Sequence, residues 1–263
     1  MAGDGGSSLR RGLLALEVLA QVEGEDDAGL GVVEAARRLG VDKSQASRTL
    51  RALADHGLAE RDAASRGYRV GPRVFAYAAL VSERRLLRTA PPVLERLVAA
   101  LGERAHLSVL DGAAVLTLLS QSPPHAVQAA GWAGRSVPAY CSAAGRALLA
   151  DHDGEQLRAL LGKVELTPRG PNTAASFAEL EERVRETARR GFAVADEELE
   201  PGLSAVAAPV RRFDGRIVAA LNVSGPTFRF RARLAEAARE VVNGAEELST
   251  QLGVAADATP VVV

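Results

Sequence analysis

The N-terminal part of the chain carries apolar side chains at helical spacing, interrupted by short polar segments. The first apolar stripe has its members at Leu9, Leu13, Leu16 and Leu19. This spacing predicts a helix that ends near Val22, and the same period predicts a second helix over 32–39 and a third over 43–55. Gly40 is suited to the position at the end of a helix that takes a left-handed conformation, and Asp42 is suited to the N-cap position of the next helix.

After Gly57 the pattern changes from a helical period to two short apolar runs. Residues 58–61 and 68–70 predict the two strands of a hairpin, with DAASRG between them. The order helix, helix, tight turn, helix and hairpin is that of a winged helix-turn-helix. We expect this domain to span residues 9–71.

The next segment is expected to connect two domains. Residues 72–88 have a mixed helical pattern, which suits a linker helix. Pro91 and Pro92 suit the first turn of a separate helix that ends at Leu101, since prolines are tolerated there. A second domain is therefore expected over 89–252.

Apolar runs in the C-terminal part predict strands mixed with helices. Two such runs flank Asp111 and Gly112, a pair that is typical of a hairpin turn. Ser142 and Ser176 each precede a helical pattern and suit N-caps. The remaining predicted elements are strands over 192–195, 203–210 and 217–223 and a terminal helix over 231–252. The predicted fold class is α+β.

Charge is distributed unevenly along the chain. The formal net charge is −1, yet residues 37–73 contain nine Lys or Arg and four Asp or Glu. A basic segment on an otherwise acidic chain is typical of a nucleic-acid-binding module. No apolar run reaches the ~18 residues of a membrane span, and no secretory signal is recognisable. Cys141 is the single cysteine, which fits a reducing compartment, so we expect a cytoplasmic protein without a membrane partner.

The third predicted helix begins with polar side chains before its apolar stripe starts. Ala46 and Leu50 set the buried side, which leaves the polar residues outward. In a helix-turn-helix the N-terminal end of this helix enters the major groove, where Ser and Gln reach base edges, Arg binds guanine and Lys neutralises phosphate. The candidate DNA-binding residues are Lys43, Ser44, Gln45, Ser47, Arg48 and Arg51 of the helix and Arg66 of the wing. The alternative is a winged helix that serves only as a dimer contact, as in some methyltransferases.

Residue patterns that support catalysis or metal binding are scarce. His56, His106, His125 and His152 are not spaced with cysteine as metal ligands are, and we interpret them as solvated or core residues. Cys141 has no neighbouring base in the sequence. Glycine-rich nucleotide loops and a GxSxG motif are missing as well. The sequence therefore predicts no catalytic residue, no metal site and no cofactor.

Three stretches of the chain, in a fixed order and spacing, resemble the motifs of one known family. They are VVEAARRLGVDKSQASRTLRAL with the wing RGYRVG, then VPAYCSAAGRALLA, then GFAVADEELEPGLSAVAAPVRRFDGRIVAALNVSGP. In this order they make the chain resemble the IclR family of bacterial transcriptional regulators from about Leu9 to Leu252. The resemblance implies an N-terminal winged helix-turn-helix, a linker helix and a C-terminal GAF-like effector-binding domain. It also implies a homodimer or homotetramer on double-stranded operator DNA.

The resemblance further implies a pocket for a small-molecule effector in the C-terminal domain. The start of the helix after Ser142 adds backbone N–H groups that favour an anion. Asn222 and Ser224 are two apart on one strand and share a face. The implied effector-binding residues, with those of the helix start, are Ser142, Ala143, Ala144, Gly145, Asp196, Ser204, Ala205, Asn222 and Ser224. Asp196 belongs to the acidic segment DEELEPG and is expected to accept a hydrogen bond from a ligand hydroxyl, a water or a backbone N–H.

Two positions depart from relatives that sense small oxo-acids. Ala205 stands where those relatives have a cysteine, and Asn222 stands where they have a serine. An aromatic or hydroxylated acid is therefore expected to fit better than a small oxo-acid. Two rival hypotheses remain at this point, an enzyme that uses a winged helix as its dimer module and a DNA-binding protein whose second domain only assembles subunits.

Overall fold

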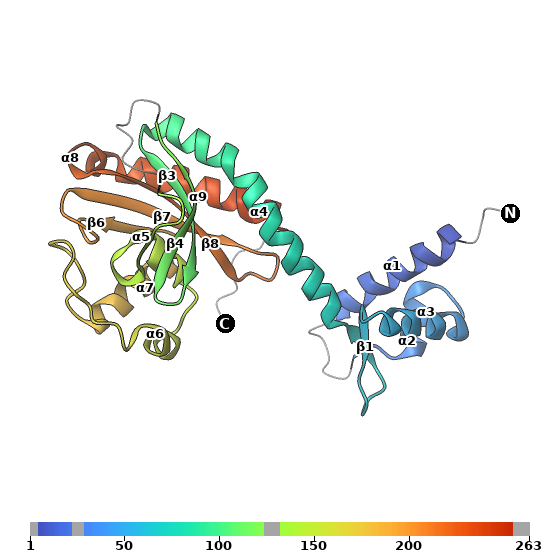
Figure 1. The fold of residues 1–263 in the computed structure, drawn as a ribbon. Coiled ribbons are helices and arrows are strands. Elements are labelled where there is room, and N and C mark those ends of the chain that lie inside the picture. Colours follow the sequence, from blue (N-terminus) through green and yellow to red (C-terminus); the bar gives the residue numbers. More distant parts are fainter. Residues whose placement is uncertain (1–4, 23–28, 124–131, 255–263) are drawn as a thin grey trace. The chain divides into compact units, whose positions relative to one another are not determined.

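A computed structural model describes residues 5–22, 29–123 and 132–254. The chain divides into two compact units, Met1–Val81 and Ser82–Val263 (Figure 1). The elements of the first unit are α1 (Gly5–Val22), α2 (Val32–Leu39), α3 (Lys43–Asp55), β1 (Ala59–Arg61) and β2 (Tyr68–Val70). The predicted winged helix-turn-helix order is confirmed.

Local sequence signals explain the turn between α2 and α3. Gly40 has φ 64° and ends α2 in the left-handed conformation, which glycine adopts without steric cost. The Asp42 carboxylate accepts a hydrogen bond from the backbone N–H of Gln45 at 2.9 Å and so caps α3. Ala46, Leu50 and Leu53 are buried as the stripe predicts.

The predicted apolar stripe of α1 packs in the core along its C-terminal half and is exposed along its N-terminal half. Ala15 and Leu19 are buried in the core of the first unit, whereas Leu9 and Leu13 are 67% and 54% exposed. Ala15 and Leu19, in the C-terminal half of α1, belong to the same core cluster as buried residues of α2 and α3. The first half therefore presents apolar side chains at the surface.

The helix after the wing is longer than predicted. A single helix α4 runs from Pro72 to Leu101 and contains Pro91 and Pro92 in its interior. The predicted break between a linker helix over 72–88 and a second helix that opens at the prolines is therefore wrong. Both prolines lie on the exposed side, while Ala90 and Val93 are buried, so packing of the apolar stripe maintains the helix through the prolines.

The second unit combines a curled antiparallel sheet with helices on both faces. Its strands are β3 (Arg104–Asp111), β4 (Ala114–Gln121), β5 (Ser136–Pro138), β6 (Ala193–Asp196), β7 (Leu203–Arg211) and β8 (Ile217–Pro226). Its helices are α5 (Ala143–Leu148), α6 (Gly154–Leu161), α7 (Phe177–Arg190), α8 (Thr227–Phe230) and α9 (Leu234–Gln251), with the C-terminal half of α4. The predicted α+β class is confirmed, while β5, α6 and α8 were not predicted.

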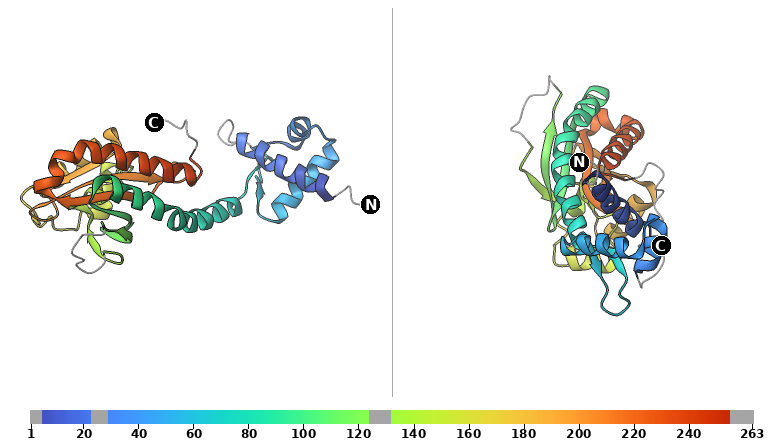
Figure 2. Two further views of the ribbon diagram at one scale, coloured as in Figure 1. Left: turned by 90° about the horizontal axis from the view of Figure 1, so that it is seen from above. Right: turned by 90° about the vertical axis from the view of Figure 1, so that its right-hand side faces the viewer.

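Among the described residues the strand order in this sheet is β5-β4-β3-β8-β7-β6, with every neighbouring pair antiparallel. One face packs on α9 and the C-terminal half of α4, which lie side by side (Figure 2). The other face packs on α5, α6 and α7. Strand residues therefore alternate between two cores, and Leu221 and Val223 belong to the first while Ala220 belongs to the second.

Candidate functional site

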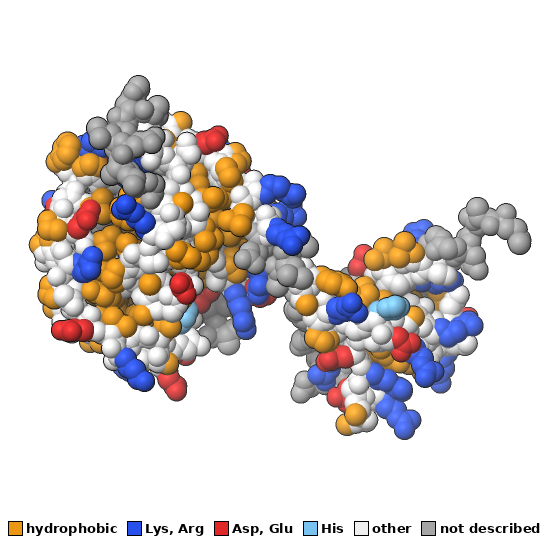
Figure 3. Space-filling model, viewed as in Figure 1, with side chains coloured by type: hydrophobic (Ala, Val, Ile, Leu, Met, Phe, Trp, Pro, Cys, Tyr) orange, Lys and Arg blue, Asp and Glu red, His pale blue; other side chains and the backbone are white. Residues whose placement is uncertain are grey.

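The first candidate surface is the exposed side of α3 with the wing. Lys43, Ser44, Arg48 and Arg51 are exposed, and Gln45 and Ser47 are half-buried. Lys and Arg side chains gather on the lower part of the N-terminal unit in Figure 3. The polar start of α3 is thus held outward by the burial of Ala46 and Leu50 on the opposite side.

The wing is shaped by Asp62 at its base. The Asp62 carboxylate accepts hydrogen bonds from the backbone N–H groups of Ser65 and Ala64, and the bonds from Ser65 are the main cause that lowers the pKa of Asp62. Arg66 follows with φ 59°, a conformation that non-glycine residues seldom adopt, and its side chain is exposed. The turn therefore presents Arg66 to solvent beside the hairpin.

The second candidate site is a cavity on the sheet face that α5 covers. The space between its lining atoms, counted together with solvent at its open mouth, is about 540 Å³. Its lining residues are His106, Ser108, Val115, Thr117, Trp132, Val137, Ser142, Ala143, Ala144, Ala195, Leu199, Leu203, Ala205, Asn222 and Ser224. Among these described lining residues there is no Asp, Glu, Lys or Arg, so hydroxyl, amide, imidazole and backbone groups supply the polar contacts.

Most of the predicted effector-binding residues lie in this cavity. Ser142, Ala143 and Ala144 line it from the start of α5, and the Ser142 hydroxyl oxygen caps that helix by accepting from the Gly145 N–H at 3.1 Å. Ala205 lines it from β7. Asn222 and Ser224 line it from β8 on one strand face, as their spacing predicts.

Gly145, Asp196 and Ser204 do not line the cavity. Asp196 and Ser204 alternate with the lining residues Ala195 and Ala205, so they lie on the other face of the sheet. There the Ser204 hydroxyl donates to Asp196 Oδ1 at 2.6 Å, and Arg231 Nη2 lies 2.9 Å from Asp196 Oδ2. A Cβ on Gly145 would collide with the backbone of Ala139, so this glycine allows close packing of α5 on the preceding turn.

Strands β3 and β4 contribute lining residues that were not predicted from the sequence. His106 and Ser108 of β3 and Thr117 of β4 line the cavity, and Trp132 approaches His106 with 5.9 Å between the ring centroids. A signal was present, because His106 and Ser108 are polar residues two apart in the apolar run HLSVL. Such a pair shares one strand face, and its polarity sets that face apart from the apolar core.

Among the described lining residues His106 is the one ionisable side chain, and 4% of its surface is exposed. Its Nε2 lies 3.3 Å from the Ser224 hydroxyl oxygen. Burial, and secondarily the positive charge of Arg104, lower the pKa of His106 from 6.5 to about 4. The imidazole is therefore neutral at pH 7.

This pKa predicts an acid-dependent loss of stability. Between pH 6.5 and about 4 the unfolded chain binds a proton at His106 that the folded chain does not. The free energy of unfolding should therefore fall as the pH is lowered through this window, by up to ~1.4 kcal/mol per pH unit from this residue. Urea denaturation at pH 7 and pH 5 should show a shallower pH dependence in a His106→Phe variant than in the native chain. Equal dependence in the two proteins would contradict the assignment.

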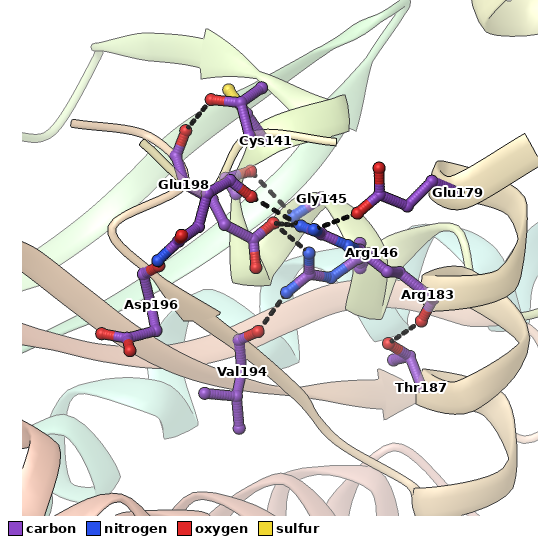
Figure 4. Close-up of polar contacts among 12 residues, drawn as sticks. Cys141, Gly145, Arg146, Glu179, Arg183, Thr187, Val194, Asp196 and Glu198 are labelled. Carbon is purple, nitrogen blue, oxygen red and sulfur yellow. Dashed lines mark hydrogen bonds and ion pairs between the residues drawn. The ribbon is translucent and has the colours of Figure 1, made fainter. Parts of the chain in front are cut away.

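A buried ion pair joins two walls of the cavity. The side chains of Arg146 on α5 and Glu198 after β6 are 3% and 7% exposed, and they contact each other directly. Arg146 also donates to the Val194 carbonyl, and Arg183 Nη1 lies 2.7 Å from Glu198 Oε2 (Figure 4). Because α5 and Leu199 both line the cavity, the pair holds these two walls together.

Both the N-terminal and the C-terminal parts of the chain match known protein families. Residues 78–250 match the family described as bacterial transcriptional regulator IclR C-terminal, and residues 8–63 match the IclR helix-turn-helix domain. The chain belongs to the IclR family. This IclR-family protein is a transcriptional regulator with a helix-turn-helix DNA-binding domain and a C-terminal effector domain, and not an enzyme.

The similarity to named relatives covers most of the chain. The HTH-type transcriptional regulator BhcR of Paracoccus denitrificans is 35% identical over 92% of this chain and 86% of its own length. The Pca regulon regulatory protein of Pseudomonas putida is 31% identical over 83% of this chain and 74% of its own. The enzyme hypothesis raised from the sequence is thereby excluded for this IclR-family protein.

Solved structures of the family share the fold. IclR of Thermotoga maritima has a TM-score of 0.60 and 25% identity, covering 94% of this chain and 99% of that one. An IclR homologue from Microbacterium hydrocarbonoxydans in complex with 4-hydroxybenzoate has a TM-score of 0.59 and 25% identity, covering 93% and 98%. In the part of the chain that the structure describes, no helix is long and apolar enough to cross a membrane.

Proposed function

We propose that the protein binds a pseudo-palindromic operator through α3 and the wing, and that a small organic acid in the cavity modulates this binding. Lys43, Ser44 and Arg48 are exposed at the end of α3 that a helix-turn-helix inserts into the major groove. Gln45, Ser47 and Arg51 extend the base- and phosphate-contacting set along α3, and Arg66 adds a contact from the wing. The protein would act in the cytoplasm, where its operator lies.

A two-fold assembly would supply the second recognition helix. Leu9 and Leu13 are large apolar side chains exposed on α1. Apolar positions that the unit itself does not bury favour a contact with a second copy. The proposed species on DNA is a homodimer, or a homotetramer built from two such dimers.

The cavity with its buried polar atoms is the main support for the proposed binding of an effector. Its lining combines nine apolar residues with six uncharged polar ones, which suits a small organic ligand that carries hydrogen-bonding groups. Ser142 and the backbone N–H groups of Ala143 and Ala144 suit a carboxylate, since they lie at a helix start. Ala205 keeps one wall apolar, which favours an aromatic or hydroxylated acid. The ligand-bound homologue supports this class of effector.

Titration of acids against operator-bound protein tests the proposal. We expect an acid from a panel of aliphatic and aromatic acids to change operator affinity about 5- to 150-fold, the usual range of allosteric coupling. Ser224→Ala should weaken the acid about 5- to 10-fold by removing one hydrogen bond, with ligand-free operator affinity unchanged. Ser136→Ala, on β5 and outside the cavity, is the matched control. If no acid alters operator affinity, the rival hypothesis of an assembly domain without an effector is correct.

A further inference from the structure

Two polar atoms in the cavity have no partner within the described chain. They are His106 Nδ1 and Asn222 Oδ1, and both are buried. His106 on β3 and Asn222 on β8 are directly opposite each other in the antiparallel register. Opposed side chains have their Cβ atoms ~5 Å apart, so one ligand can contact both.

Leaving such atoms unpaired is costly, because a buried donor or acceptor loses its hydrogen bonds to water. Ser204, Asp196 and Arg231, by contrast, satisfy one another on the opposite sheet face. His106 Nδ1 and Asn222 Oδ1 both belong to residues on the face that forms the cavity. A bound group that supplies their hydrogen bonds recovers the lost free energy.

The chemistry of the pair selects that group. The amide oxygen of Asn222 only accepts hydrogen bonds. The neutral imidazole of His106 has one N–H donor and one acceptor nitrogen, and its Nε2 lies within hydrogen-bonding distance of the Ser224 hydroxyl. In the tautomer in which this hydroxyl donates to Nε2, the proton lies on Nδ1. A carboxylate cannot donate to Asn222 Oδ1, whereas a hydroxyl donates to that oxygen and accepts from His106 Nδ1.

We propose that His106 and Asn222 form a specificity-determining pair that recognises a hydroxyl group on the effector. This inference rests on the proposed function, because it presupposes an organic acid in the cavity. The carboxylate of that acid contacts the start of α5, and its hydroxyl contacts the pair. Effectors of this protein are therefore hydroxy acids, and the corresponding acids without the hydroxyl bind poorly.

Matched pairs of acids that differ by one hydroxyl test the inference. Suitable probes are 4-hydroxybenzoate with benzoate, 4-hydroxyphenylacetate with phenylacetate, and 3-hydroxybutyrate with butyrate. Calorimetric titration of the full chain should show at least one pair in which the hydroxy acid binds about tenfold more tightly or better. In His106→Phe and in Asn222→Leu this ratio should fall to about threefold or less. Ser136→Ala should keep the native ratio.

A spectroscopic measurement on the native protein gives the same test without a substitution in the cavity. In nitrogen-15 NMR spectra, the chemical shifts of the two imidazole nitrogens of His106 should indicate a neutral ring with its proton on Nδ1. The Nδ1 signal should shift with the hydroxy acid of the responsive pair and stay in place with its partner acid.

The outcomes separate this inference from the proposed function. If the acids bind but every pair has equal affinities, or if the ratio persists in both variants, the pair does not recognise a hydroxyl and the inference is wrong, while the effector site stands. An unperturbed His106 signal with a bound hydroxy acid would have the same meaning. If no acid binds although operator binding is intact, both the inference and the effector half of the proposed function are wrong.

Discussion

Replacing Glu198 by alanine should lower the free energy of unfolding by about 3–5 kcal/mol, the usual cost of removing one partner of a buried ion pair. Arg146 would keep its charge in a site where its side chain is 3% exposed, and among the described residues the Val194 carbonyl would remain as its hydrogen-bond partner. Arg183 would also lose a contact, although it retains Glu179. Urea denaturation of the full chain measures the effect.

Glu182 on α7 is the matched control for this experiment. Its side chain is 60% exposed and pairs with Arg185 and Arg189 at the surface. Glu182→Ala should cost less than ~1 kcal/mol, because exposed ion pairs contribute little. Similar losses in the Glu198 and Glu182 variants would show that the Arg146–Glu198 pair does not hold the two walls of the cavity together.

The N-terminal unit was predictable because its signals are local. Gly40 and Asp42 mark the end of one helix and the start of the next through their own backbone and side-chain preferences, and both act in this way in the structure. The stripe Ala46, Leu50 and Leu53 needs only a helical period to be recognised. These features do not depend on distant parts of the chain.

Predictions failed where distant packing decides the outcome. Pro91 and Pro92 are good helix-start signals, yet the helix passes through them because its apolar side packs on α9 and the sheet. Leu9 and Leu13 fit the helical stripe but extend beyond the core of their unit. Neither result follows from spacing, since both depend on which surface is available to pack against.

The cavity was predicted in part for a similar reason. Asn222 and Ser224 share a strand face whatever the register, so their common location was predictable. Asp196 and Ser204 were assigned through the family resemblance, but strand alternation in the structure turns both away from the cavity. His106 was interpreted as a solvated or core residue, because its place opposite Asn222 arises only from the pairing of β3 with β8.

Substitution of Arg48 on α3 is expected to lower the affinity for operator DNA. Arg48→Ala should weaken operator binding about 5- to 150-fold, equivalent to ~1–3 kcal/mol, if its guanidinium contacts a guanine edge. Lys43→Ala should instead weaken binding to all sequences alike and reduce the salt dependence by about one phosphate contact. Arg185→Ala, which removes an exposed positive charge from α7, is the charge-matched control and should leave binding unchanged. Fluorescence anisotropy with labelled DNA over a range of salt concentrations distinguishes these cases.

Selection of binding sites from random double-stranded DNA, with the native protein and with Arg48→Ala in parallel, tests the central claim most directly. The native protein should enrich an inverted repeat whose half-sites lie about 10 bp or a multiple of this apart, since each recognition helix needs its own major-groove face. Arg48→Ala should enrich the same repeat with preference lost at one base pair in each half-site. If the native protein enriches no sequence, or if Arg48→Ala selects the native site with native affinity, α3 does not read an operator.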